Sequence, residues 1–333
     1  MGGGVRWRLP SLAMRTLLRA ACRIPPSPGG SGNGLGSRGS DRCRARLQAI
    51  PAAFVAGYRC AVSMPGFRSL EAELGSFEVS LRGFAYEGAA MGLTLLDVLT
   101  PWTASRLERF CGSIASPHIY VSHVGAGWVL ARVPLNVTRF LRRFDPVLRW
   151  LVIDGYGFHE GFFHAARFLR HLAPPSRVGG YGQRAFDQGF GRSLWFLEQG
   201  AVVGIADRIA SFPTERRGDL WSGVGLAAVY AGEVEDAALR DLYRIAAGWG
   251  DHLSQGAAFG AKARERGGAL TEYTDQACDI LCGLRAAEAA ALSDAMLDNL
   301  PQDGVEPAYE VWRGRVRHHF RRRRLCEAHC NRL

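Results

Sequence analysis

Lysine is almost absent from this chain of 333 residues, since Lys262 is the only lysine among 41 basic residues. The other cations are arginines, and they gather at the two ends of the chain. Residues 1–47 carry a net charge of +8 and residues 313–333 carry +7, which leaves −5 for residues 48–312 out of the total of +10. Nucleic-acid binding needs a basic face, so we expect no nucleic-acid partner for this acidic body.

Long apolar runs are also missing. The longest stretch without an acidic or basic residue, 110–131, contains Pro117, two histidines and several serines and glycines. A membrane-spanning helix needs about 20 predominantly apolar residues, so this stretch is a poor candidate. We therefore expect a cytoplasmic protein whose membrane association, if it has one, arises through partners or through its basic ends.

The short motifs of well-known catalytic and cofactor sites are absent. There is no G-x-S-x-G segment, no Walker loop, no pair of C-x-x-C motifs and no dinucleotide-binding fingerprint after a strand. The eight cysteines are scattered along a long chain, which argues against a disulfide framework. We expect no cofactor and no bound metal ion, and these patterns leave open whether the protein is an enzyme.

A composition shift marks where the folded body begins. Residues 24–41 are rich in Pro, Gly and Ser, which is typical of a flexible linker. From there to about Leu325 no comparable linker occurs. The sequence predicts a flexible basic segment over residues 1–41, one domain over 42–325 and a basic tail over 326–333.

Helix signals dominate the body, and only the segment around Ile119 is as compatible with a strand as with a helix. Asp145 followed by Pro146 predicts a helix start, and Gly155 its end. Pro213 predicts another start. The segment 301–320 predicts a final amphipathic helix that has Ala308, Val311, Trp312 and Val316 on one side.

Small residues recur in pairs four positions apart. Successive first glycines of these pairs are 73, 28, 34 and 33 residues apart, and Gly125 in the longest gap is a degenerate copy. Such a pair lets a neighbouring helix approach closely, and a period of about 33 residues suits two helices and two turns. We predict an all-α, helical-repeat, solenoid-like single domain from the pairs Gly88/Gly92, Gly161/Ala165, Gly189/Ser193, Gly223/Ala227 and Gly256/Gly260.

A polar residue stands directly before each of these glycines. Residues equivalent by repeat line one wall, so we expect a ladder formed by Glu87, Glu160, Gln188, Ser222 and Gln255. A ladder of this kind suits a binding groove or a buried polar network. Aromatic residues concentrate nearby, with core packing as the alternative to a pocket. The groove or pocket candidates are Tyr86, Tyr156, Phe158, Gln188, Arg192, Trp195, Trp221 and Gln255.

The segment DGYGFHEGFFH, residues 154–164, carries two histidines and two carboxylates. It resembles a helical zinc signature with one residue too many, because His159 and His164 lie roughly 140° apart on a regular helix. Glu160 and His164 are four apart and suit an acid–base pair, with Asp154 just outside the helix start. The structural alternative is that Asp154 caps this helix. Glu87 completes the set of catalytic candidates.

Several long segments resemble the bacterial family called domain of unknown function 1702 (DUF1702). They include LRGFAYEGAAMGLTLLDVLTPW (81–102), WLVIDGYGFHEGFFH (150–164) and RRGDLWSGVGLAAVYAG (216–232), and the resemblance covers about residues 45–315. It implies a UnbL-like protein encoded in gene clusters for enediyne and related natural products. The implied partners are an FG-GAP/ASPIC-type repeat protein and a membrane protein similar to an electron-transport subunit.

The resemblance identifies no catalytic residues in this chain, so it leaves two functions open. The first is an accessory protein of secondary metabolism, a helical scaffold that binds a partner protein or a hydrophobic intermediate. The second is an enzyme that uses a Glu/His acid–base pair in an aromatic-lined pocket, acting on a polyene-type intermediate.

Overall fold

The computed structural model describes residues 41–64 and 66–330, and for residues 327–330 it describes only the backbone. Residues 1–40 of the expected N-terminal segment lie outside the described residues. The described elements are all helical, which confirms the all-α class. They are α2 (Asp41–Ser63), α3 (Phe67–Gly75), α4 (Val79–Leu99), α5 (Arg106–Cys111), η1 (Ser116–His118), α6 (Ile119–Arg132), α7 (Val137–Leu141), α8 (Arg149–His171), α9 (Tyr181–Leu197), α10 (Val202–Ala210), α11 (Thr214–Tyr230), α12 (Asp236–Ile245), η2 (Ala247–Trp249), α13 (Gly250–Arg266), α14 (Glu272–Cys282), α15 (Ala286–Ala295) and α16 (Ala308–Cys330).

Local sequence signals set several of the helix starts. Pro213 directly precedes α11, as predicted, and the side chain of Thr271 caps α14 in a reciprocal pair with Thr274. The predicted helix start at Asp145 and Pro146 is early, because α8 begins at Arg149; Asp145 instead accepts hydrogen bonds from the backbone N–H groups of the turn before it. The predicted end of that helix at Gly155 is wrong, because α8 continues to His171. Gly155 does not end it because burial of the glycine against a neighbouring helix outweighs its low helix propensity.

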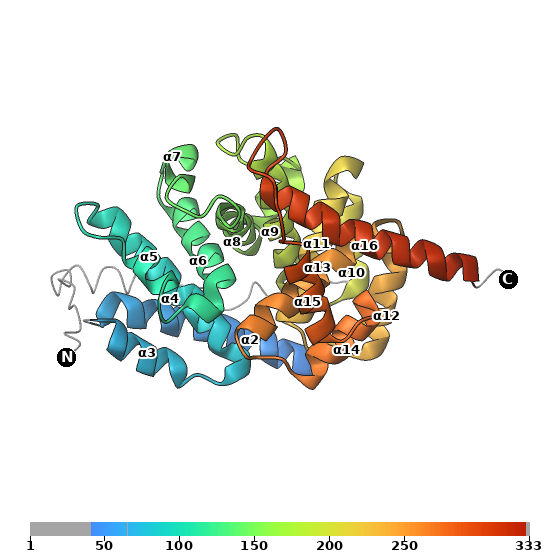
Figure 1. Ribbon diagram of the computed structural model, residues 1–333, viewed down its shortest axis with the longest axis horizontal. Coiled ribbons are helices and arrows are strands. Elements are labelled where there is room, and N and C mark those ends of the chain that lie inside the picture. Colours follow the sequence, from blue (N-terminus) through green and yellow to red (C-terminus); the bar gives the residue numbers. More distant parts are fainter. Residues whose placement is uncertain (1–40, 65, 331–333) are drawn as a thin grey trace.

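The longer helices form a curved row in the order α2, α4, α6, α8, α9, α11 and α13, each in contact with the next (Figure 1). Helices from the two ends of the row also contact each other. The rings of Phe84 in α4 and Tyr230 in α11 lie 4.9 Å apart, and Arg264 of α13 donates a hydrogen bond of 2.8 Å to the backbone oxygen of Ser80. The row therefore encloses a core that α16 also helps to line.

Glycines govern how closely these helices approach. A Cβ atom on Gly223 of α11 would lie 2.0 Å from the carbonyl oxygen of Gln188 in α9, and one on Gly225 would lie 2.0 Å from that of Leu253 in α13. One glycine of the G-x-G segment thus faces the preceding helix and the other faces the following helix. The same arrangement recurs at Gly125/Gly127, Gly155/Gly157 and Gly189/Gly191.

The predicted repeat needs a correction in α8. Gly161 faces the side chain of Ser193, whereas Gly155 is the residue whose added Cβ would meet the backbone of Val124 in the preceding helix. The sequence pattern favoured Gly161 because it requires a small residue four positions after the glycine, and His159 stands at that position after Gly155. The glycines that contact the backbone of the preceding helix are Gly88, Gly125, Gly155, Gly189, Gly223 and Gly256. Successive members are between 30 and 37 residues apart, so the repeat has no fixed period.

The final helix, α16, lies across the row and then protrudes from it (Figure 1). Trp312 and Val316 are buried on one side of α16, as its amphipathic pattern predicted. The helix continues beyond Leu325, where the sequence suggested that the domain ends. Among the described residues, no helix is both long enough and apolar enough to cross a membrane.

Candidate functional site

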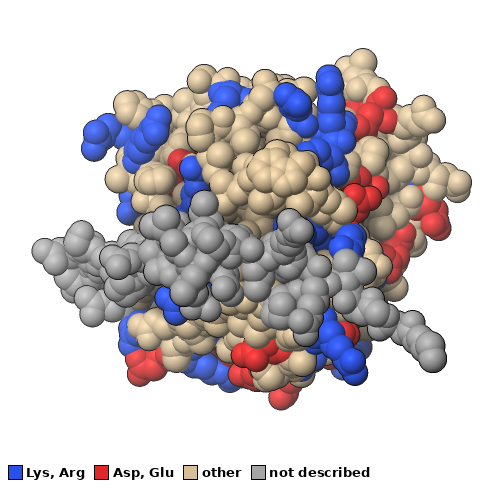
Figure 2. Space-filling view, turned by 90° about the vertical axis from the view of Figure 1, so that its left-hand side faces the viewer, with Lys and Arg blue, Asp and Glu red and all other residues tan. Residues whose placement is uncertain are grey.

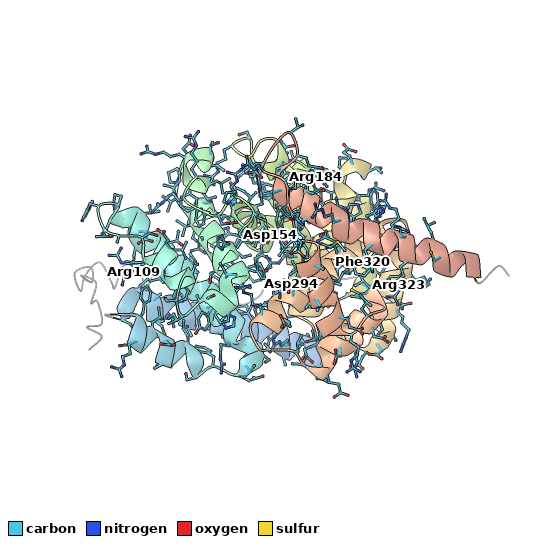
Figure 3. The ribbon with its side chains drawn as sticks, in the orientation of Figure 1. Arg109, Asp154, Arg184, Asp294, Phe320 and Arg323 are labelled. Atoms are coloured by element: carbon cyan, nitrogen blue, oxygen red, sulfur yellow. The ribbon has the colours of Figure 1, made fainter. Side chains whose placement is uncertain are left out.

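A chain of hydrogen-bonded polar side chains runs through the centre of the molecule. Asp154 of α8 lies near the middle of the molecule (Figure 3) and is fully buried. It accepts a hydrogen bond of 2.8 Å from the Gln188 amide of α9 and pairs with Arg192. Ser222 of α11 then lies 3.4 Å from the Gln188 side-chain oxygen and 2.9 Å from that of Gln255 in α13. Three of the five expected ladder residues, Gln188, Ser222 and Gln255, therefore form a buried polar network with Asp154 across four adjacent helices.

The member of this ladder in α8 is Asp154 and not Glu160. Each ladder residue directly precedes the glycine that packs on the preceding helix, so the shift from Gly161 to Gly155 also moves the polar position by six residues. Asp154 consequently lies inside α8, in contrast to the predictions that it caps this helix or lies outside its start.

Two small chambers lie beside the ladder, with volumes of about 30 and 40 Å³. Both are lined by Arg192, Leu226 and Tyr230, and the first also by Glu87 and Trp128. A water molecule needs about 10–15 Å³ of such space, so each chamber has room for only a few waters. The other aromatic residues that line the first chamber are Phe54, Phe84, Phe158, Phe162 and Phe196.

Glu87 is buried in the wall of the first chamber. Burial raises the pKa of this carboxyl from 4.5 to about 7, with a smaller opposing effect from the positive charge of Arg192 and a further increase from Asp154. Near neutral pH, Glu87 is thus divided between its neutral and ionised forms. It is an acid held beside an aromatic surface, in a chamber that has little free volume.

A second group of ionisable side chains surrounds Glu160, near the C-terminal half of α8. One carboxylate oxygen of Glu160 lies 3.3 Å from Nδ1 of His159, and the other lies 3.2 Å from Nδ1 of His164. Glu160 and His159 are buried, whereas the side chain of His164 is 52% exposed. Arg132 of α6 donates from Nε to Nε2 of His159 across 3.1 Å.

This hydrogen-bond pattern assigns the protons of both histidines. Because Nε2 of His159 accepts from Arg132, its Nδ1 carries the hydrogen and donates to Glu160. Burial alone would raise the pKa of Glu160, but the two histidines outweigh it and lower that pKa. The ionised carboxylate accepts the Nδ1 hydrogen of His164, so the lone pair of His164 is at Nε2, on an exposed ring. His164 is therefore oriented as a base by Glu160.

The backbone of α8 explains how the two histidines meet. At His164 it has φ −128° and ψ 24°, outside the helical range, so the helix is kinked there. The prediction that His159 and His164 point apart is wrong, since it assumed a regular helix; their ring centroids are 5.9 Å apart. The donor atoms of His159, Glu160 and His164 lie within 4.8 Å of one another. Because Nε2 of His159 accepts a hydrogen bond from Arg132, the neutral ring of His159 has its hydrogen on Nδ1 and offers no lone pair there to a shared metal ion.

The four catalytic candidates thus separate into two groups. Glu87 and Asp154 lie beside the central chambers, and Glu160 and His164 form the kink cluster. Trp128 lies between them: it lines the first chamber, and its ring centroid is 5.3 Å from that of His159. Sequence reasoning missed Arg132 and Trp128, which come from α6, because only the tertiary structure brings α6 beside α8.

The groove candidates are buried and have separate roles. Tyr86 packs on His118, and the hydroxyl of Tyr156 accepts a hydrogen bond of 2.8 Å from Arg177. Trp195 and Trp221 are buried in the core. Phe158 and Arg192 line the first chamber, and Gln188 and Gln255 belong to the ladder.

A larger hollow lies on the surface, along the protruding part of α16. Its volume is about 790 Å³. Seven of its residues come from one side of α16, and two apolar residues lie just after the ends of α14 and α15. Figure 3 places Arg323 toward this end of the molecule, away from Asp154. The groove is lined by Leu284, Met296, Gly314, Arg315, His318, His319, Arg322, Arg323 and Cys326.

Comparisons with known proteins place the whole body of the chain in one family. No curated protein and no solved structure matches the chain. The model of the family described as "Protein of unknown function (DUF1702)" matches residues 34–320, which includes the ladder, the kink cluster and every helix of the row. The chain therefore belongs to the DUF1702 family.

Proposed function

We propose that this protein is an accessory protein of bacterial secondary metabolism, of the enediyne or polyketide type, and that it acts as a helical scaffold which binds a partner protein. The pathway follows from the gene clusters that the family resemblance implies. The scaffold role has support from the contrast between a filled interior and an open surface groove. The inner chambers hold about 30 and 40 Å³, whereas the groove on α16 holds about 790 Å³.

The energetics of the interior favour this role. Buried polar side chains such as Asp154 and Gln188 bond to one another, and glycines such as Gly223 set the helices at backbone contact. A hydrogen-bonded polar network and close-packed helices favour one rigid arrangement. Such a body suits the presentation of a fixed surface better than the enclosure of a large hydrophobic intermediate.

Deletion of the gene, followed by mass spectrometry of the metabolites, tests the pathway. We expect loss of the final product and accumulation of an intermediate. Complementation with the native gene restores the product, whereas complementation with an Arg322→Glu variant does not, because its groove has an altered charge. An unchanged metabolite profile after deletion contradicts the proposed role.

A second candidate function is an enzyme, which the geometry at Glu160 favours. Glu160 holds the ring of His164 through Nδ1, and Arg132 and His159 hold Glu160 in turn. In this function Nε2 of His164 accepts a proton from a polyene-type intermediate, and the carboxylate of Glu160 stabilises the imidazolium that forms.

Complementation of the same deletion strain separates the two functions. The enzyme requires that Glu160→Gln and His164→Ala both fail to restore the product, while His171→Ala, an exposed histidine of the same helix, restores it. The scaffold requires that all three variants restore it. Circular dichroism and thermal unfolding of each variant show whether it is folded.

A further inference from the structure

The groove on α16 has the pattern of a helix-binding surface. Arg315, His318, His319, Arg322 and Cys326 are spaced at positions i, i+3, i+4, i+7 and i+11 of one helix. These positions lie on one face. At a rise of about 1.5 Å per residue the face is about 16 Å long, which exceeds the size of a phosphate or another small anion. The shape therefore suits an elongated ligand.

The floor of the groove is apolar. Leu284 follows Gly283, the residue directly after α14, and Met296 is the residue directly after α15. Both side chains are partly exposed and pack against the core of the molecule. Methionine adapts its shape to the surface that packs on it. An amphipathic helix places apolar residues at i, i+3, i+4 and i+7 on a floor of this kind.

The rim of the groove is basic. Arg315 donates three hydrogen bonds to the backbone oxygens of Met296, Asp298 and Asn299, which use three of its five N–H groups and do not neutralise its charge. Arg322 is exposed. Other arginines of α16 are engaged differently, since Arg313 and Arg321 pair with Asp219 and Asp251 of the body. The arginines of the rim thus offer positive charge to a ligand.

The chain's own N-terminal segment does not suit this groove. Residues 1–47 carry a net charge of +8, and residues 313–333 carry +7. Two segments of the same sign repel each other. Charge complementarity requires an acidic occupant instead.

We propose that the α16 groove binds an acidic amphipathic helix of a partner protein, whose apolar side chains contact Leu284 and Met296 and whose carboxylates pair with Arg315 and Arg322. This inference rests on the proposed scaffold function, because it names the kind of partner that the scaffold binds. Rim charges act mainly on the rate of association and on its salt dependence. Apolar contacts on the floor supply much of the affinity.

Fluorescence anisotropy tests the proposal with the full chain and a labelled synthetic helix that has leucines along one face and glutamates on the other. We expect saturable binding that weakens as the salt concentration rises. Arg322→Glu is expected to weaken binding by about tenfold, equivalent to about 1.4 kcal/mol. Arg68→Glu, the same charge change on α3 at the opposite end of the molecule, leaves binding unchanged. Basic side chains also occur on that opposite face, in several separate groups (Figure 2).

The floor is tested by Leu284→Ser, with Val203→Ser as the control at an exposed apolar residue of α10. Weaker binding in the first variant alone supports the proposal. Equal binding of a scrambled peptide with the same composition overturns it, because charge alone then accounts for the affinity. Stronger binding of duplex DNA or of anionic lipid vesicles, sensitive to Arg322→Glu, also overturns it. So does a dimer of the chain that the same variant dissociates.

The outcomes separate this inference from the proposed function. If the peptide binds as expected but Arg322→Glu still restores the metabolite, the groove binds acidic helices and the pathway role fails. If the variant fails to restore the metabolite and the peptide does not bind, the groove has a role in the pathway and the acidic helix is the wrong partner.

Discussion

The side chain of Gln188 donates to the carboxylate of Asp154 across 2.8 Å, and it joins two helices at the level where their backbones touch. Gly189, the next residue after Gln188, would place a Cβ atom 1.8 Å from the carbonyl oxygen of Asp154. Close backbone approach and side-chain hydrogen bonding therefore occur at one site. A glycine at this position lets the helices come close enough for short polar side chains to bridge them.

Substitution of Gly223 by alanine is expected to destabilise the protein strongly. The new Cβ atom would lie 2.0 Å from the backbone oxygen of Gln188, so α9 and α11 must separate. Overpacking of a core costs about 1–3 kcal/mol or more. Urea unfolding monitored by circular dichroism measures the change.

Gly75→Ala is the matched control, because nothing lies within 4 Å of a Cβ atom at Gly75, in the last turn of α3. Alanine there leaves the free energy of unfolding unchanged or raises it slightly. Equal stability of the Gly223 and Gly75 variants contradicts the role of glycine in helix approach.

Substitution of Asp154 by asparagine is expected to lower the free energy of unfolding by about 3–5 kcal/mol. The carboxylate is fully buried against Arg192, so its removal leaves a buried guanidinium without its counter-ion. Asp241→Asn breaks an ion pair with Arg244 on the surface of α12 and changes the stability by less than about 1 kcal/mol.

A double variant checks the cause. Replacing Arg192 by leucine together with Asp154→Asn removes the unpaired charge, so it recovers part of the lost stability. If the double variant is less stable by the sum of the two single effects, the pair does not act as a unit.

The ionisation of Glu87 makes stability depend on pH. Its pKa is raised in the folded state from 4.5 to about 7, with burial as the main cause. The folded state therefore binds more protons than the unfolded state between these values. The stabilising contribution of the neutral acid is fully present below about pH 4.5 and is lost as the pH rises through about 7.

Comparison of the native chain with Glu87→Gln isolates this effect, because glutamine does not ionise. The free energy of unfolding of the native chain, relative to that of the variant, is expected to fall by as much as about 3 kcal/mol between pH 4.5 and pH 7. Denaturant unfolding at several pH values measures the difference. Two parallel stability curves would rule out a raised pKa at Glu87.

Within the kink cluster, the pKa of His159 is expected to depend on the charge of Glu160. Burial lowers the pKa of His159 below 6.5, and a hydrogen bond to Glu160 partly opposes this. Glu160→Gln removes the negative charge that favours the imidazolium, so the pKa of His159 is expected to fall further. Glu108→Gln, an exposed change on α5, leaves it unchanged. NMR of the imidazole nitrogens measures both the pKa and the proton on Nδ1, and an Nε2–H form of His159 contradicts the assigned tautomer.

The sequence by itself determined the helical class, the start of α11 at Pro213 and the buried side of α16 around Trp312. These features depend on local properties, namely helix caps, proline geometry and apolar periodicity. It also showed that glycines and polar residues occur in adjacent positions, as at Ser222 and Gly223. Each of these signals is carried by residues close together in the chain.

Only the tertiary structure decided which polar residue of α8 joins the ladder and whether His159 and His164 lie close together. Asp154 belongs to the ladder because Gly155, and not Gly161, meets the preceding helix. His159 and His164 meet at Glu160 because the backbone departs from helical geometry at His164. Helix contacts and kinks depend on atoms from elsewhere in the chain, such as those of Val124 in α6, and a helical wheel contains no information about them.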